Sequence, residues 1–76
     1  MAIAYVLLNS ELGQDSTVET SLKDVPEVKE IYAVYGVYDF IVKVEAEGMS
    51  ELKDIITNTI RRIQNVRSSL TLITVE

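Results

Sequence analysis

The chain has 76 residues, a formal net charge of −5 at pH 7, and a composition that is 47% hydrophobic and 25% charged. A folded chain of this size buries only about 60% of the surface that its unfolded form exposes. It contains no cysteine, so neither disulfides nor thiolate metal sites are available to stabilise it. We therefore expect one globular domain, residues 1–76, that associates with further subunits to cover its apolar side chains.

Charge and residue types exclude several classes of function. Seven basic residues against twelve acidic ones leave no basic footprint for phosphates, so we expect no direct nucleic-acid binding. No apolar run approaches the roughly 20 residues that span a bilayer, and the N-terminus lacks a charged leader, which indicates a soluble, cytoplasmic protein without a membrane partner. Without histidine or cysteine there is no Ser-His-Asp or Cys-His system and little metal ligation. We expect no catalytic residues, no metal and no cofactor.

The first two elements are a strand and a helix. Residues 3–8 are continuously apolar, which is typical of a central strand covered on both faces. Ser16 and Glu19 have the spacing of a capping box, and a stripe of apolar residues follows them, so we expect a helix over residues 16–24. Pro26 stops this helix because proline lacks the N–H and clashes with the preceding turn.

Two further strands follow as a hairpin. Residues 28–35 are rich in β-branched and aromatic side chains and predict a strand that Gly36 closes. A third strand begins after the glycine, with alternate residues on one face: Tyr38, Phe40, Val42 and Val44. The turn between the two strands is short, as in a β-hairpin.

The last two elements repeat the helix and strand pattern. From Met49 to Ile63, apolar residues recur at steps of three and four, which predicts an amphipathic helix of about four turns that Asn65 ends. Residues 66–75 return as a fourth strand, in which Leu70 and Leu72 share one face.

This order, strand, helix, strand, strand, helix, strand, predicts an α+β fold of the ferredoxin-like βαββαβ type. In it, a four-stranded antiparallel sheet carries two helices on one face. The other face is bare in a monomer, although residues 3–8 are apolar on both sides. A large exposed apolar sheet marks an association surface, so we expect face-to-face dimers that form a dimeric α+β barrel, and further assembly.

The stretch Gly36-Val37-Tyr38-Asp39 interrupts the apolar hairpin and has two interpretations. A glycine at a strand end permits a positive φ, and an acid at the start of an apolar strand is costly to bury unless it accepts hydrogen bonds or meets a cation. One interpretation is a tight turn in which Asp39 accepts hydrogen bonds from backbone amides. The other is a backbone-lined notch at a subunit boundary that holds a small zwitterion, with Asp39 near its positive charge. The same turn can serve both purposes.

The segments "VPEVKEIYAVYGVYDFIVKVEA" and "IRRIQNVRSSLTLITV" resemble the ligand-binding domain of the Lrp/AsnC feast-or-famine transcription regulators, also called the RAM domain. The resemblance covers essentially the whole chain. Its most specific part is the turn from Gly36 to Asp39, which matches the G-x-[YF]-D pattern of the family. The N-terminal helix-turn-helix domain of the full-length regulators has no counterpart here, so we expect a stand-alone RAM protein.

The resemblance implies a homodimer that assembles into an octamer or similar ring, and amino-acid effectors that bind between dimers. It implies ligand-binding roles for the hairpin residues Tyr35, Gly36, Val37, Tyr38 and Asp39, and weaker ones for the fourth-strand residues Ser68, Ser69 and Thr71. It also implies mixed assemblies with full-length Lrp/AsnC regulators as a further kind of partner.

The function expected is thus an amino-acid-binding, oligomerising regulatory module without its own DNA-binding domain, linked to transcription or amino-acid metabolism. An alternative is a small dimeric α+β-barrel enzyme, of the cofactor-independent monooxygenase or isomerase type, which shares this topology. The absence of histidine and tryptophan and the short length weaken that alternative. A third hypothesis is an assembly partner with an empty site.

Overall fold

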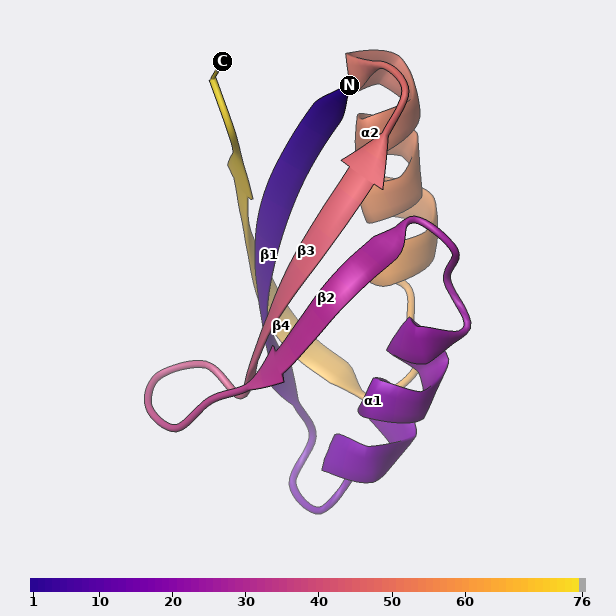
Figure 1. The fold of residues 1–76 in the computed structure, drawn as a ribbon. Coiled ribbons are helices and arrows are strands. Elements are labelled where there is room, and N and C mark those ends of the chain that lie inside the picture. The colour runs from indigo at the N-terminus through magenta and orange to yellow at the C-terminus, as the bar shows by residue number, and fades with distance from the viewer. Residues whose placement is uncertain (76) are drawn as a thin grey trace.

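The computed structural model describes residues 1–75 and shows one antiparallel sheet with both helical segments on the same side (Figure 1). The elements in chain order are β1 (Ala2–Ser10), α1 (Asp15–Lys23), β2 (Val28–Ala33), β3 (Phe40–Ala46), α2 (Met49–Ile55), η1 (Ile56–Ile60) and β4 (Val66–Ile73). The order of strands in the sheet is β2-β3-β1-β4. The predicted ferredoxin-like fold is confirmed.

β1 is a central strand because it pairs with β3 on one side and with β4 on the other. Its side chains alternate: Ala4, Val6 and Leu8 are fully buried beneath the helices, and the residues between them lie half-buried on the opposite face. This explains the continuous apolar run, since both faces of the strand are apolar. The core that the helices complete has these buried members: Val18, Leu22, Val25, Phe40, Val42, Val44, Leu52, Ile56 and Ile60.

The predicted capping box at α1 is wrong. The helix begins at Asp15, so Ser16 lies inside its first turn and is exposed, and no side chain caps the N-terminus. The reason is the preceding tight turn, where Gly13 has a φ of +78° and the amide of Gln14 donates to the carbonyl of Glu11 at 2.9 Å. The carboxylate of Asp15 instead supplies the negative charge that a helix N-terminus favours.

The second helix is shorter than predicted and changes its winding. After α2, the segment η1 is a π-helix, closed by a bond in which the Arg61 amide donates to the carbonyl of Ile56 at 2.9 Å. The helical segment ends at Ile60, not at Asn65. Asn65 lies instead in the turn into β4, with a φ of +76°, a conformation that asparagine tolerates better than most residues.

The β2–β3 hairpin has a longer loop than predicted. β2 ends at Ala33 and β3 begins at Phe40, so the expected strand residues Val34, Tyr35 and Tyr38 belong to a six-residue loop, residues 34–39. The amide of Val34 donates to the carbonyl of Asp39 at 2.9 Å and closes this loop.

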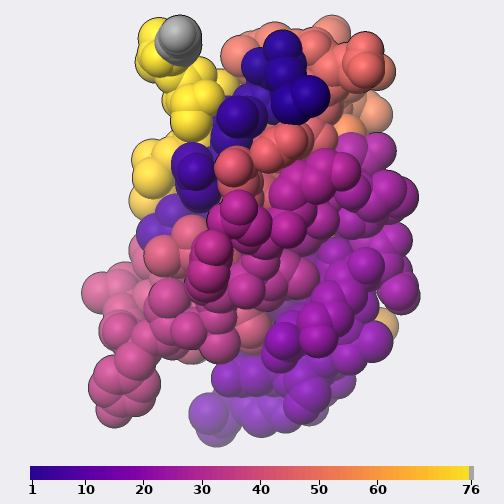
Figure 2. Space-filling model, in the orientation of Figure 1, coloured from indigo at the N-terminus to yellow at the C-terminus, as the bar shows by residue number. Residues whose placement is uncertain are grey.

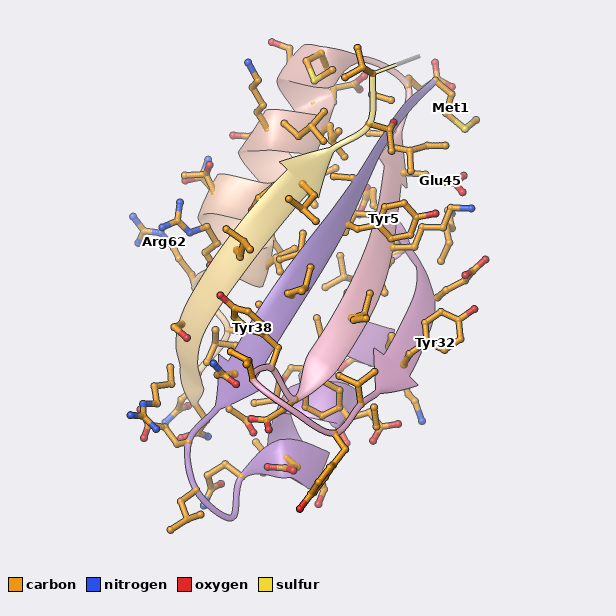
Figure 3. All side chains as sticks on the ribbon, turned by 90° about the vertical axis from the view of Figure 1, so that its left-hand side faces the viewer. Met1, Tyr5, Tyr32, Tyr38, Glu45 and Arg62 are labelled. Atoms are coloured by element: carbon orange, nitrogen blue, oxygen red, sulfur yellow. The ribbon has the colours of Figure 1, made fainter. Side chains whose placement is uncertain are left out.

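The face of the sheet opposite the helices carries many large apolar side chains. Tyr5 and Tyr32 both lie on it in Figure 3, and Tyr32 is 52% exposed. In β4, Leu70 and Leu72 are also exposed there, since they pair with Leu7 and Tyr5 of β1. The predicted bare apolar face is confirmed, and we call it the open face.

A polar cluster lies on the open face along β2 and β3, at one edge of the sheet. Lys43 forms ion pairs with Glu45 at 3.3 Å and with Glu30 at 3.8 Å, and the hydroxyl of Tyr32 donates to Glu30 at 2.7 Å. The hydrogen bond to Glu45 is the main reason that the pKa of Lys43 is raised. The bond to Glu30 likewise raises the pKa of Tyr32.

Among residues 1–75, no helix has the length and apolar character needed to cross a membrane.

Candidate functional site

The loop of residues 34–39 projects from one end of the sheet (Figures 1 and 2). Gly36 has a φ of +146°, which side-chain-bearing residues rarely adopt, so the predicted need for glycine in this turn is confirmed. Tyr35 is fully exposed and Val37 is 83% exposed. Apolar side chains presented on a projecting loop are suited to contact with another molecule.

Asp39 fixes the base of this loop to the end of β1. Its Oδ2 atom accepts a hydrogen bond from the backbone N–H of Ser10 at 2.9 Å and lies 3.3 Å from the Ser10 hydroxyl oxygen. The amide of Asp39 donates to the carbonyl of Leu8 at 2.9 Å. The predicted structural role of Asp39, accepting from a backbone amide, is confirmed.

A second carboxylate shares the Ser10 hydroxyl. Oδ1 of Asp15 lies 2.7 Å from the Ser10 Oγ atom, whereas Oδ2 of Asp39 lies 3.3 Å from it. A hydroxyl has one proton to donate, so Asp15 takes it and the amide bond remains the stronger tie between Ser10 and Asp39. Ser10 is 6% exposed, which places this network at the edge of the core.

Beside this network lies an open hollow of about 600 Å³. Its lining comes from the end of β1, the turn after it, the hairpin loop and the start of β4: Asn9, Ser10, Leu12, Val37, Asp39, Arg67 and Ser68. Its lining residues thus include one acid and one arginine, together with residues that carry hydroxyl, amide and apolar side chains. We call it the hairpin hollow.

The structure brings together three of the eight predicted ligand-binding residues. Val37, Asp39 and Ser68 line the hairpin hollow, and the Ser68 hydroxyl accepts a hydrogen bond from the Asn9 side chain at 3.1 Å. Tyr35, Gly36 and Tyr38 belong to the same loop but do not line the hollow.

The other two predicted residues lie on the opposite face of β4. Ser69 pairs with Leu8 and Thr71 pairs with Val6, and both partners face the helices, so these side chains point away from Ser68. Thr71 lines a different hollow, next to the second helix.

Four residues of the hairpin hollow were not predicted: Asn9, Ser10, Leu12 and Arg67. The polar pair Asn9-Ser10 directly after an apolar strand was a usable signal, since strand ends commonly carry site residues. Arg67 had no such signal, because only the pairing of β1 with β4 brings it to the loop.

Comparison with known proteins identifies the family of this fold. The model of the Lrp/AsnC ligand-binding domain matches residues 3–76. The chain therefore belongs to the Lrp/AsnC ligand-binding domain family. The resemblance noted from the hairpin motif is confirmed.

Two solved structures match along nearly their whole length. FFRP-DM1 has a TM-score of 0.94 and 39% identity, with 99% of this chain and 100% of that chain covered. The hypothetical protein PHS023 from Pyrococcus horikoshii has a TM-score of 0.91 and 38% identity, with 100% and 92% covered. A regulator from Neisseria meningitidis, NMB0573, solved as a complex with L-Met, has a TM-score of 0.85 over 99% of this chain and 50% of its own. At 16% identity it shares the fold alone.

Two longer proteins contain a similar segment. The HTH-type transcriptional regulator FL11 from Pyrococcus furiosus is 30% identical over 71 residues, which are 93% of this chain and 46% of the regulator. A homocitrate synthase from Sulfurisphaera tokodaii is 45% identical over 56 residues, 74% of this chain and 12% of the enzyme. The chain spans less than half the length of each.

Proposed function

We propose that this protein is an amino-acid-binding, oligomerising regulatory module and not an enzyme. The observation that carries the proposal is the hairpin hollow, in which one acid and one base lie among neutral hydrogen-bonding groups. A free amino acid is a zwitterion, so a site for it needs an acceptor for the ammonium group and a donor for the carboxylate.

Asp39 is suited to the ammonium group. The Ser10 N–H donates to Oδ2, which is also the atom near the Ser10 hydroxyl, and within residues 1–75 no hydrogen bond to Oδ1 is seen. A carboxylate has about four lone-pair positions, so Oδ1 retains capacity for a ligand while Oδ2 holds the loop. The structural and ligand-binding interpretations of this residue are compatible.

Arg67 is suited to the ligand carboxylate. Within the described part of the chain it forms no ion pair, and its guanidinium presents a planar set of donors that matches a carboxylate. Asn9 and Ser68 add an amide and a hydroxyl beside it. The open side of the hollow leaves room for a second subunit to complete the pocket around the ligand side chain.

The open face and the projecting loop support assembly. Exposed leucines and tyrosines on the open face suit packing against the same face of a second copy, as a dimeric α+β barrel. The exposed Tyr35 and Val37 then remain available for contacts between dimers, in an octamer or similar ring. Because the hairpin hollow adjoins that loop, ligand binding and assembly state are thermodynamically linked.

The relatives indicate two settings for such a module. FL11 is named a transcriptional regulator, and the homocitrate synthase is a metabolic enzyme that contains a similar segment. A regulator of the same fold, NMB0573, was solved with L-Met. The proposed role is therefore regulation of transcription or of amino-acid metabolism in the cytoplasm, including mixed assembly with full-length regulators of the family.

Isothermal titration calorimetry with individual amino acids tests the proposal. An Arg67→Gln variant is expected to bind its amino acid at least about tenfold more weakly, the loss of a charge-assisted hydrogen bond. An Arg62→Gln variant is the matched control, because Arg62 is exposed on the helix side and lines none of the hollows described. Absence of binding by all twenty amino acids contradicts the proposal.

A further inference from the structure

A second hollow, of about 210 Å³, lies where the second helical segment meets β4. It is lined by Lys53, Ile56, Thr57, Arg61, Thr71 and Ile73. We call it the helix hollow. It is separate from the hairpin hollow, because Thr71 is three residues along β4 from Ser68, about 10 Å, and points to the other face of the sheet.

The helix hollow is positively charged on an acidic protein. Lys53 and Arg61 both line it, and no acid does, although the chain carries a net charge of −5. Neither cation forms an ion pair with another residue of the described range 1–75. Asp54, the acid next to Lys53, instead accepts a hydrogen bond from the side chain of Asn58.

The widened turn of the helix borders this hollow. Ile56 and Thr57 belong to η1, and Arg61 follows it and donates the i→i−5 bond. Such π-helical turns are rare and are found frequently at functional sites. The chain thus departs from regular helix at the place where it brings a guanidinium and a hydroxyl to one opening.

The hollow also has an apolar side. Ile56 is 4% exposed and belongs to the core, and Ile73 packs against that core from β4. Charged and hydroxyl groups therefore stand beside an aliphatic wall. An inorganic anion would leave these aliphatic side chains exposed to water, whereas an anion with a short hydrocarbon chain would cover them.

We propose that the helix hollow binds a small organic monoanion, a carboxylate with a short aliphatic chain. Lys53 and Arg61 take the carboxylate, and the threonine hydroxyls of Thr57 and Thr71 donate to it. No carboxylate lines this hollow to hold an ammonium group, in contrast to Asp39 in the hairpin hollow. The two sites therefore differ in ligand class: a zwitterion in one and a carboxylate without an amine in the other.

Saturation-transfer NMR on the full chain tests this proposal with 3-methylbutanoate as the probe. We expect saturable binding at concentrations up to about 10 mM. The neutral analogue 3-methyl-1-butanol is expected to bind at least about tenfold more weakly, because it lacks the charge. Inorganic phosphate has no C–H protons to observe, so its binding is measured by displacement of 3-methylbutanoate; it is expected to be at least about tenfold weaker, because phosphate lacks the aliphatic chain. Absence of saturable binding, or phosphate binding as tight as that of 3-methylbutanoate, overturns the proposal.

Variants locate the site. Lys53→Met and Arg61→Met are each expected to weaken the binding of 3-methylbutanoate by about tenfold, and Arg62→Met to leave it unchanged. All three side chains are exposed, so the fold is retained. Arg67→Gln separates the two sites, since it impairs amino-acid binding alone. Equal binding by wild type and the Lys53 and Arg61 variants overturns the assignment.

Discussion

Replacing Asp39 separates its structural role from its proposed ligand-binding role. In Asp39→Ala the backbone N–H of Ser10 loses its acceptor at 2.9 Å, while the Ser10 hydroxyl keeps its bond to Asp15 at 2.7 Å. The loss is therefore essentially one hydrogen bond to a charged group, about 1.5–3 kcal/mol of unfolding free energy. For a domain of this size, that corresponds to a fall in Tm of about 6–24 °C.

The isosteric variant Asp39→Asn is expected to behave differently. The amide oxygen of asparagine can still accept from the Ser10 N–H, so the loss of unfolding free energy is about 1 kcal/mol or less. The negative charge is gone, however, and amino-acid binding should fall by at least about tenfold. Asp15→Asn is the control, because Asp15 contacts the same hydroxyl but does not line the hairpin hollow.

The assay is urea denaturation at a fixed protomer concentration, since assembly couples stability to concentration, together with calorimetry on the same samples. If the free energy of unfolding of Asp39→Ala lies within about 0.5 kcal/mol of the wild-type value, Asp39 does not have the structural role inferred from its hydrogen bond to Ser10. If Asp39→Asn loses as much free energy of unfolding as free energy of amino-acid binding, Asp39 has a structural role only.

Three further predictions concern the loop, the open face and the polar cluster. Gly36→Val should lose about 1–3 kcal/mol of unfolding free energy and disturb ligand binding or assembly, because φ is +146°. Gly48→Ala should cost less, about 0.5 kcal/mol, because Gly48 has an extended φ of −133° and loses only the preference for glycine at the N-cap of α2; urea denaturation and size-exclusion chromatography compare the two variants. Leu72→Glu should dissociate dimers without unfolding the protomer, because Leu72 is exposed on the open face. Ser16→Glu, on the helix side, should leave the dimers intact. Light scattering measures both masses, and an unchanged mass for Leu72→Glu would exclude the open face as the interface. The free energy of unfolding should fall as pH rises above about 10, because folding raises the pKa of Lys43. The stabilisation is present below the pKa that Lys43 has in the unfolded chain and is lost as the pH rises through its pKa in the folded protein. Lys43→Met should flatten this part of the pH profile, and a profile identical to that of wild type would count against the ion pairs.

The fold was predictable wherever side-chain periodicity decides the structure. The continuous apolar run of β1 implied burial on both faces, and the spacing from Met49 onward implied a helix. The helix end was missed because Ile63 continues that spacing and still packs against the core from a turn. Apolar periodicity indicates which side chains are buried, and here apolar side chains continue to pack against the core for several residues after the helix ends.

The hairpin loop shows the limit of residue propensity. Val34 and Tyr35 favour strands, yet β2 ends at Ala33, because the bond from the Val34 amide to the Asp39 carbonyl closes the loop there. Asp39 was identified from its unusual place in an apolar stretch. Arg67 was not, since its place beside Asp39 depends on how β4 pairs with β1, which local sequence does not specify.

Native mass spectrometry of the purified protein, with and without a pool of the twenty amino acids, tests the proposed function most directly. We expect an assembly larger than a dimer that retains the mass of a specific amino acid, or that forms or dissociates when the amino acid is added. The Asp39→Asn variant should retain much less of it. A single assembly whose mass is the same with and without the pool would contradict the proposed amino-acid-binding role.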